Sequence, residues 1–137
     1  MGRIIAREAT MKLLYQMEVN SDYSEETIKV FFENNDLSDD EKDYAEHVIE
    51  GVLNNLDTID ENIEKYTKEW KINRLAKVDL AVLRIAIYEM LFRKDIPIEV
   101  CINEAIEICK KYSTDESSRF INGVLGSFVR LRSKENE

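Results

Sequence analysis

The stretch RLAKVDLAVLRIAIYEMLFR, residues 74–93, decides the fold of this chain. As a helix it is apolar on nearly every side, and within it only Lys77, Asp79, Arg84 and Glu89 interrupt the pattern. A helix that is apolar all round is normally buried at the centre of its domain. We therefore expect the other elements to pack around this segment.

Outside this stretch the chain also reads as helices. It has one proline and four glycines, and no alternation of apolar and polar residues indicates a strand. Three Ser/Thr-x-x-Glu capping boxes predict helix starts, at Ser38 with Glu41, Thr58 with Glu61 and Ser113 with Glu116. The sequence thus predicts an all-α fold of about seven helices. Besides the helix at 74–93, they are 3–20, 24–34, 38–56, 58–70, 97–112 and 114–132.

The charge is distributed unevenly along the 137 residues, whose net charge is −9. Residues 21–64 carry two basic and fifteen acidic side chains, a net charge of −13, so both ends of the chain are mildly basic. An RNA-binding surface built from the two ends is compatible with this pattern, although the pattern does not require one. The length fits a single domain, 1–137.

Several classes of protein are disfavoured. No apolar run approaches the roughly 20 residues of a membrane span, so we expect a cytoplasmic protein with no membrane contact. Cys101 and Cys109 lie about 12 Å apart along one helix and cannot bridge, which predicts buried, reduced thiols. The only histidine is His47, and no metal-binding spacing, nucleophile with a base or phosphate-binding glycine loop occurs, so we expect no metal, no cofactor and no enzyme activity.

The last predicted helix contains Gly123 and Gly126, each costing about 1 kcal/mol relative to alanine in a helix interior. Glycine allows close approach, either of another helix or of a ligand. Spacing alone favours helix packing. At the start of the same helix, Ser117 and Arg119 could help to hold a phosphate, although capping explains most of the segment.

The first predicted helix has a second apolar stripe, Ile4, Met11 and Tyr15, opposite its core face. Lys12 lies on this outer face, with Arg3 and Arg7 further round. Such a helix is either sandwiched or meets a partner, and a basic helix with an aromatic side chain can also bind RNA.

The chain resembles the NusB family of transcription antitermination factors. The matching words are AREATMKLLYQME (6–18), WKINRLAKVDLAVLRIAIYEM (70–90), DIPIEVCINEAIEICKKYS (95–113) and SSRFINGVLG (117–126). The resemblance implies two small helical bundles packed crosswise around the buried helix, with subdomains of roughly 1–70 and 71–137. It also implies an adaptor that pairs with the ribosomal protein NusE, binds boxA RNA and joins other Nus factors and RNA polymerase in read-through of terminators.

The resemblance also implies which residues bind RNA and which bind NusE. RNA would contact Arg3, Arg7, Lys12, Tyr112, Glu116, Ser117, Arg119, Phe120 and Asn122. NusE would contact Tyr15, Tyr66, Val78 and Asp79, with a basic residue of the partner facing Asp79. A salt bridge from Asp79 to Arg84 or Lys77 is the alternative within this chain.

One departure from the family concerns the first helix, where Ile4 and Ile5 stand between Arg3 and Arg7 instead of a dense arginine cluster. Fewer cations mean a smaller counterion-release term, which predicts weak RNA binding without the partner. Two other readings stay open: a helical scaffold or homodimer that binds no RNA, and a fragment of the ribosomal RNA methyltransferases that carry a similar domain.

Overall fold

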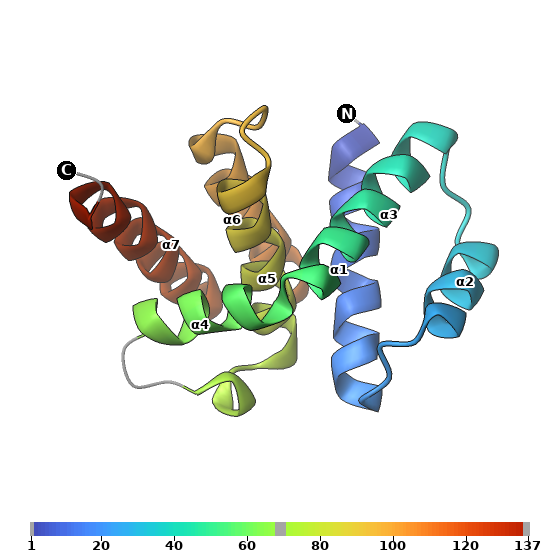
Figure 1. Ribbon diagram of the computed structural model, residues 1–137, viewed down its shortest axis with the longest axis horizontal. Coiled ribbons are helices and arrows are strands. Elements are labelled where there is room, and N and C mark those ends of the chain that lie inside the picture. Colours follow the sequence, from blue (N-terminus) through green and yellow to red (C-terminus); the bar gives the residue numbers. More distant parts are fainter. Residues whose placement is uncertain (1, 68–70, 136–137) are drawn as a thin grey trace.

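The computed structural model describes residues 2–67 and 71–135. Seven α-helices form in this part of the chain, with a short 3-10 helix, η1, at Ile72–Arg74 (Figure 1). The α-helices are α1 (Gly2–Asn20), α2 (Glu25–Asn34), α3 (Asp39–Asn54), α4 (Leu56–Tyr66), α5 (Lys77–Phe92), α6 (Ile98–Tyr112) and α7 (Asp115–Glu135). The predicted all-α fold and the order of its helices are confirmed.

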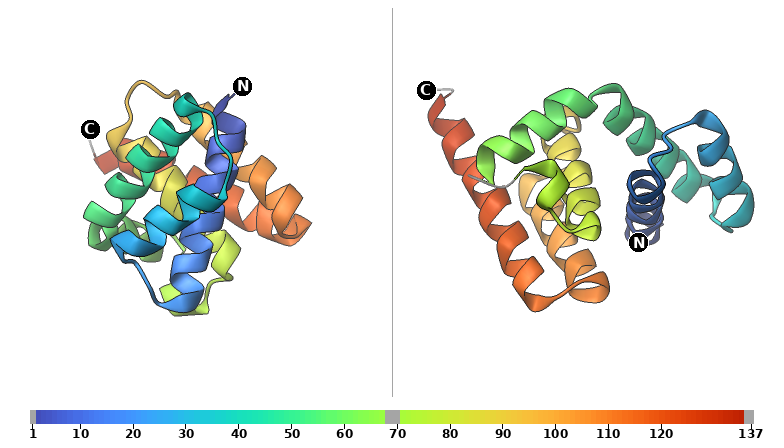
Figure 2. Two further views of the ribbon diagram at one scale, coloured as in Figure 1. Left: turned by 90° about the vertical axis from the view of Figure 1, so that its right-hand side faces the viewer. Right: turned by 90° about the horizontal axis from the view of Figure 1, so that it is seen from below.

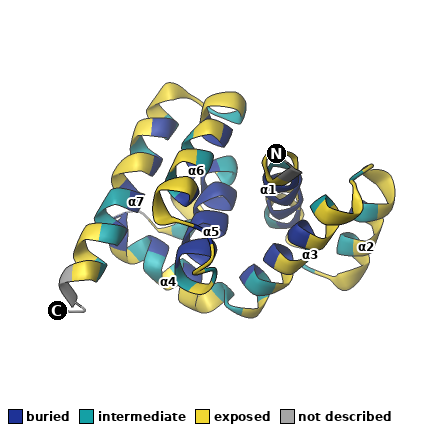
Figure 3. Cartoon of the chain, turned by 90° about the horizontal axis from the view of Figure 1, so that it is seen from above, coloured by how far each residue is buried: buried dark blue, intermediate teal, exposed yellow. Residues whose placement is uncertain are grey.

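The central helix is α5, as its apolar surface predicts. Every residue from Asp79 to Met90 is buried, and Figure 3 shows α5 almost wholly in the colour of buried residues. It packs against α1, α3, α4, α6 and α7. Apolar side chains therefore meet a neighbouring helix on all sides of α5.

The remaining helices form two groups. In Figure 1 the helices α1, α2 and α3 lie on one side of the molecule and α4, α6 and α7 on the other, with α3 leading into α4 through Asn55. The right-hand view of Figure 2 shows α1 end-on, with α2 on one side and α5 and α6 on the other, and α1 packs against α2, α3 and α5. Helix α4, which precedes residue 71, packs on α5 and α7.

The charged residues within α5 connect it to the other helices. The Arg84 guanidinium donates to both carboxylate oxygens of Asp60 on α4, at 2.9 and 2.8 Å, and to Glu18 on α1 at 2.8 Å. The side chain of Arg84 is 3% exposed, so these bonds provide its charge compensation inside the protein. Loss of one partner of such a pair costs about 3–5 kcal/mol.

A second buried pair involves Arg7, which the resemblance assigns to RNA phosphates. Arg7 is 3% exposed, and its guanidinium donates to both oxygens of Glu89, at 3.1 and 3.2 Å. Burial and the neighbouring Glu89 raise the pKa of Tyr44, whose hydroxyl stays protonated and also donates to Glu89. Arg7 turns inward because Glu89, fully enclosed on α5, requires a counter-charge.

The predicted helix starts have mixed outcomes. The Ser38–Glu41 capping box forms, with the Glu41 amide donating to Ser38 Oγ at 3.2 Å and the Ser38 amide donating to Glu41 Oε1 at 2.8 Å. The start at Thr58 is wrong, because α4 already begins at Leu56. The predicted end of this helix at Trp70 lies outside the described residues.

The glycine that allows close helix packing is Gly51 on α3. A Cβ at this position would overlap the ring of Tyr88 on α5, so only glycine fits the contact. A Cβ on Gly123 or on Gly126 would meet nothing within 4 Å. The interpretation of these two glycines as helix-packing positions is therefore wrong.

The two cysteines are buried and unpaired, as predicted, and burial raises the pKa of each thiol to about 12. Across residues 2–67 and 71–135, no helix combines the length and apolar character needed to cross a membrane.

Candidate functional site

The end of α6 meets the middle of α1 in a cluster of four residues, Glu8, Lys12, Lys111 and Tyr112, called here the Tyr112 cluster. The Tyr112 hydroxyl donates to Glu8 Oε1 at 2.8 Å, and the Lys111 ammonium donates to both Glu8 oxygens at 3.0 and 3.1 Å. The ammonium nitrogens of Lys12 and Lys111 lie 5.2 and 5.4 Å from the centre of the Tyr112 ring. Two cations thus lie close to one aromatic ring, at distances that favour cation–π attraction.

Glu8 organises this cluster. Burial alone would raise the pKa of Glu8, but hydrogen bonds from Tyr112 and Lys111 outweigh burial and lower that pKa. The same hydrogen bond raises the pKa of Lys111. At neutral pH the cluster therefore combines one carboxylate with two ammonium groups, and its net charge is positive.

The start of α7 is attached to the start of α5 through Asp79. Ser117 Oγ donates to one Asp79 oxygen at 3.0 Å, and Ser113 Oγ donates to the other at 3.3 Å. The predicted capping by Ser113 is wrong by one residue, since Thr114 Oγ1 accepts from the Ser117 amide at 3.0 Å. Asp79 is buried between these hydroxyls and is bonded to neither Arg84 nor Lys77, which corrects the predicted salt bridge.

A pocket of about 340 Å³ opens beside this attachment, between η1 and α7. Its lining consists of Arg74, Leu75, Ala76, Asp79, Thr114, Glu116, Ser117 and Phe120. Phe120 is half-buried here, so part of its ring is accessible, and the exposed Arg74 adds a cation. Of the predicted RNA-binding residues, the structure thus brings Glu116, Ser117 and Phe120 into one pocket.

Arg119 and Asn122, two of the predicted RNA-binding residues, are exposed on α7. Gly123, also exposed, leaves the surface beside them open, because no other side chain or helix covers it. The alternative interpretation of this glycine, as part of a ligand surface, is thus compatible with the structure.

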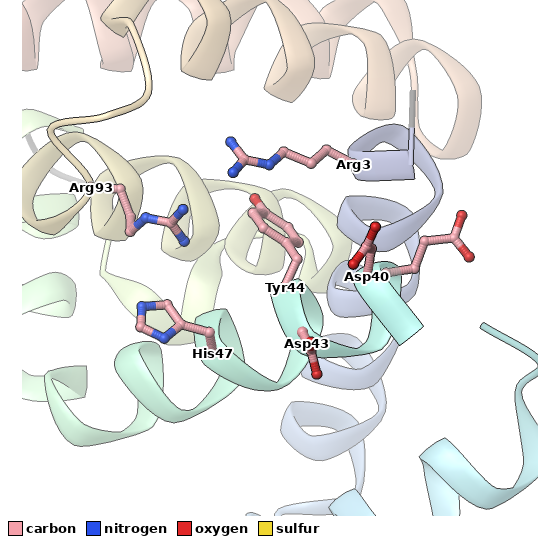
Figure 4. A pocket seen from close by; sticks show the side chains of 7 residues that line it. Arg3, Asp40, Asp43, Tyr44, His47 and Arg93 are labelled. Carbon is pink, nitrogen blue, oxygen red and sulfur yellow. The ribbon is translucent and has the colours of Figure 1, made fainter. Parts of the chain in front are cut away.

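Arg3 lies elsewhere, in a second and larger pocket of about 820 Å³ (Figure 4). Its guanidinium carbon is 5.3 Å from the centre of the Tyr44 ring, and its Nη2 nitrogen is 3.9 Å from Asp95 Oδ2. Figure 4 shows Tyr44 between Arg3 and Arg93, with His47 on the next turn of α3. Arg93 donates to both oxygens of Asp95 at 2.9 Å, and this hydrogen bonding lowers the pKa of Asp95 to about 2.

Arg3 and Lys12 therefore do not act at one place. They are nine residues apart in α1, which at 100° per residue puts them on opposite sides of the helix, about 180° apart. Lys12 faces Tyr112, whereas Arg3 faces Tyr44. The basic side chains predicted for the first helix thus divide between a Tyr112 side, a Tyr44 side and the buried Arg7.

The residues predicted to contact a protein partner are also divided. Tyr15 is 40% exposed and Val78 is half-buried. Tyr66 is 4% exposed and packs edge-to-face on Phe128, with 5.4 Å between ring centres. The prediction that Tyr66 and Asp79 present their side chains at the surface is therefore wrong, because both are enclosed by α7 and the turn before it.

The second apolar stripe of α1 is only partly covered. Met11 is buried, while Ile4 is 49% and Tyr15 is 40% exposed. Helix α1 is therefore enclosed near its middle, and it leaves apolar side chains accessible on either side of Met11.

The predicted RNA-binding residues do not include Arg74 or Glu8, and the sequence places Lys111 only near the possible phosphate site, in the turn before the last helix. Lys111 and Glu8 are more than one hundred positions apart in the chain, and only the fold places them together. Their charges gave no local signal, because lysine and glutamate are common on exposed helix faces.

Comparison with known proteins gives a consistent result. A sequence model described as the NusB family matches residues 4–130. Proteins named transcription antitermination protein NusB are similar over nearly the whole chain. The one from Acetivibrio thermocellus is 50% identical, covering 96% of this chain and 91% of its own, and the one from Clostridium novyi is 45% identical, covering 95% and 99%.

Solved structures share the fold. NusB of T. maritima is 43% identical and superposes with a TM-score of 0.84, covering 93% of this chain and 90% of its own. A structure described as antitermination factors NusB and NusE in complex with dsRNA contains a chain that is 26% identical, with a TM-score of 0.85 and coverages of 95% and 97%.

Proposed function

This chain belongs to the NusB family, and on that premise we propose that it is a transcription antitermination factor. In this proposal it is a non-catalytic adaptor that binds boxA RNA together with NusE and so promotes read-through by RNA polymerase. It acts in the cytoplasm, where nascent RNA forms, and residues 1–137 work as one domain. Support for an RNA-bound assembly comes from the structural relative that is described with NusE and dsRNA.

The Tyr112 cluster is the observation that carries this proposal. Proteins recognise single-stranded RNA by stacking bases on aromatic side chains and by pairing phosphates with cations. Tyr112 offers a ring close to the ammonium groups of Lys12 and Lys111, and Phe120 offers a second ring in a pocket beside the start of α7. Both kinds of contact are therefore present, where α1 meets the end of α6 and at the start of α7 that follows.

The proposed RNA surface consists of Lys12, Arg74, Lys111, Tyr112, Glu116, Ser117, Arg119, Phe120 and Asn122. Arg3 is assigned a separate phosphate contact beside Tyr44, on the other side of α1. Arg7 is removed from this surface, since its guanidinium is committed to Glu89. Glu8 acts through Tyr112 and Lys111 by fixing their positions.

The proposed NusE surface retains Tyr15 and Val78, which have accessible atoms. Tyr66 and Asp79 support it from inside: Tyr66 packs on α7, and Asp79 fixes Ser113 and Ser117. We expect weak RNA binding by the chain alone, because its exposed cations are few and the partner supplies more.

A titration tests the proposal. RNA that resembles boxA and a scrambled RNA of equal length are added to the protein with and without NusE, each at two salt concentrations. We expect the boxA-like RNA to bind more tightly than its scrambled control when NusE is present, with affinity falling as salt rises. Equal binding of the two RNAs in the presence of NusE would contradict the proposal and favour a protein-binding scaffold.

A further inference from the structure

A groove of about 710 Å³ runs between α2 and α3, away from the proposed RNA surface. Apolar side chains from both helices lie along it, namely Ile28, Phe32, Ile49 and Leu53, together with Tyr23 from the connection before α2. The groove is therefore amphipathic, and its apolar part is formed by two neighbouring helices.

The groove exists because α2 covers α3 incompletely. Phe31 is the buried residue of α2, while Ile28 and Phe32 are only partly buried against the core. Leu53 on α3 is likewise half-buried. Each of these side chains would lose further water-accessible apolar surface if another apolar side chain entered the groove, and such burial is favourable.

The rim of the groove is acidic. Four glutamates, Glu25, Glu33, Glu46 and Glu50, line it with two lysines, Lys29 and Lys42. The Lys42 ammonium is 3.7 Å from Glu46, so part of the basic charge is already paired.

The rim belongs to the segment 21–64, whose two basic and fifteen acidic residues give a net charge of −13. RNA is repelled by such a surface, whereas a basic polypeptide is attracted to it. No residue of the proposed RNA surface belongs to this segment, although Arg3 lies next to it, beside Tyr44.

We propose that this groove binds a basic amphipathic helix of a protein partner. Its apolar side chains, spaced at i, i+3, i+4 and i+7, would enter between Ile28, Phe32 and Leu53, and its lysines or arginines would meet the glutamates of the rim. Helix α2 has 10 residues, about 15 Å in length, so the groove accommodates two to three turns of the partner helix. This interaction is independent of RNA binding and of its surface.

The test uses the full chain labelled with nitrogen-15 and a synthetic peptide of about 14 residues, made of leucine and lysine with leucine at helical spacing. The control peptide has the same composition in an order that gives no apolar face. We expect the amide signals of the groove residues, Ile28, Phe32 and Leu53 among them, to shift with the first peptide, and the control peptide to bind about tenfold more weakly.

Two matched variants separate the groove from general acidity. Glu50→Lys changes an exposed acid on the rim, and Glu61→Lys changes an exposed acid of the same segment on α4, outside the groove. Both change the net charge by the same amount. We expect Glu50→Lys to weaken peptide binding about tenfold and Glu61→Lys to change it less than about twofold.

The proposal is overturned by any of four results: no binding of the first peptide, equal binding of both peptides, equal effects of the two variants, or signal shifts located outside α2 and α3. It is also overturned if the groove signals shift on concentrating the protein alone, because a second copy then occupies the groove. RNA binding, measured separately, is expected to be unchanged by Glu50→Lys, so the failure of one proposal is distinguishable from failure of the other.

Discussion

Replacement of Arg7 by alanine is expected to lower the free energy of unfolding of the protein. We do not expect it to remove a direct contact with RNA. The guanidinium is 3% exposed and Glu89 is 1% exposed, and two hydrogen bonds of 3.1 and 3.2 Å join them. Removal of the guanidinium leaves an enclosed carboxylate without its counter-charge, which costs about 3–5 kcal/mol in the free energy of unfolding. Most small domains have only about 5–15 kcal/mol, so the loss is a large fraction of the total.

The measurement is urea denaturation followed by circular dichroism at pH 7. Arg3→Ala is the matched control, because Arg3 is an exposed arginine on the same helix, and its cost is expected to stay below about 1 kcal/mol. The double variant Arg7→Met/Glu89→Leu removes both charges, and replacement of a buried pair by apolar side chains is often near neutral. We therefore expect the double variant to be more stable than Arg7→Ala, despite the loss of the acceptor for the Tyr44 hydroxyl.

The reasoning would be refuted if Arg7→Ala changed the free energy of unfolding by less than about 1 kcal/mol while weakening RNA binding. That result would make Arg7 accessible to RNA, as the resemblance to the family implies.

Three further predictions concern stability and reactivity. Gly123→Ala is expected to stabilise the protein by about 0.5–1 kcal/mol in thermal or urea unfolding, because a Cβ there meets nothing and alanine has the higher helix propensity; destabilisation would reveal a packing contact at this glycine. Burial would raise the pKa of Glu18, but hydrogen bonds from Tyr23 and Arg84 outweigh it and lower that pKa below its ordinary value of 4.5. The stabilisation from Glu18 is therefore complete at pH values above 4.5, and it is lost as the pH falls through the lower pKa of the folded state. The difference in urea midpoint between the native chain and Glu18→Gln should shrink over this pH range. A difference that grew in acid would contradict the pairing. Cys101 and Cys109 are expected to react with Ellman's reagent at pH 8 only when the protein unfolds, since burial raises the pKa of both thiols to about 12, and rapid reaction of the native protein would be inconsistent with that burial.

Helix order and the central helix were predictable from the sequence because they depend on local patterns. The apolar surface of residues 74–93 indicates burial without knowledge of any neighbour, and the Ser38–Glu41 box involves residues three positions apart. The start of α4 was not predictable in the same way. Thr58 and Glu61 match the box, but the chain becomes helical at Leu56, and Asn55 precedes it without a side-chain cap.

The direction of individual charged side chains could not be predicted, because partners far away in the sequence decide it. Arg3 and Arg7 are one helical turn apart, yet Arg7 turns inward to Glu89, which is 82 positions away. Asp79 was expected to face either a partner protein or a nearby cation, and it accepts hydrogen bonds from Ser113 and Ser117. Helical spacing predicts on which side of a helix a residue lies. Whether another helix covers that side depends on how the whole chain packs.

The glycines illustrate the same limit. Gly123 and Gly126 lie inside a predicted helix whose start has a clear capping pattern, so a packing contact is expected there. No feature of the sequence around Gly51 predicts such a contact. The contact with Tyr88 that requires glycine at position 51 is a property of the packed helices α3 and α5.

The most direct test of the central claim is the affinity of boxA-like RNA for the complex with NusE, measured for the native chain and for Lys12→Ala, Tyr112→Leu and the control Lys29→Ala. Lys29 is an exposed lysine on α2, outside the proposed RNA surface. We predict about tenfold weaker binding for Tyr112→Leu, from lost stacking, and a salt dependence reduced by about one charge for Lys12→Ala. Lys29→Ala should bind as the native chain does; equal affinities for all four proteins would contradict the assignment of RNA binding to the Tyr112 cluster.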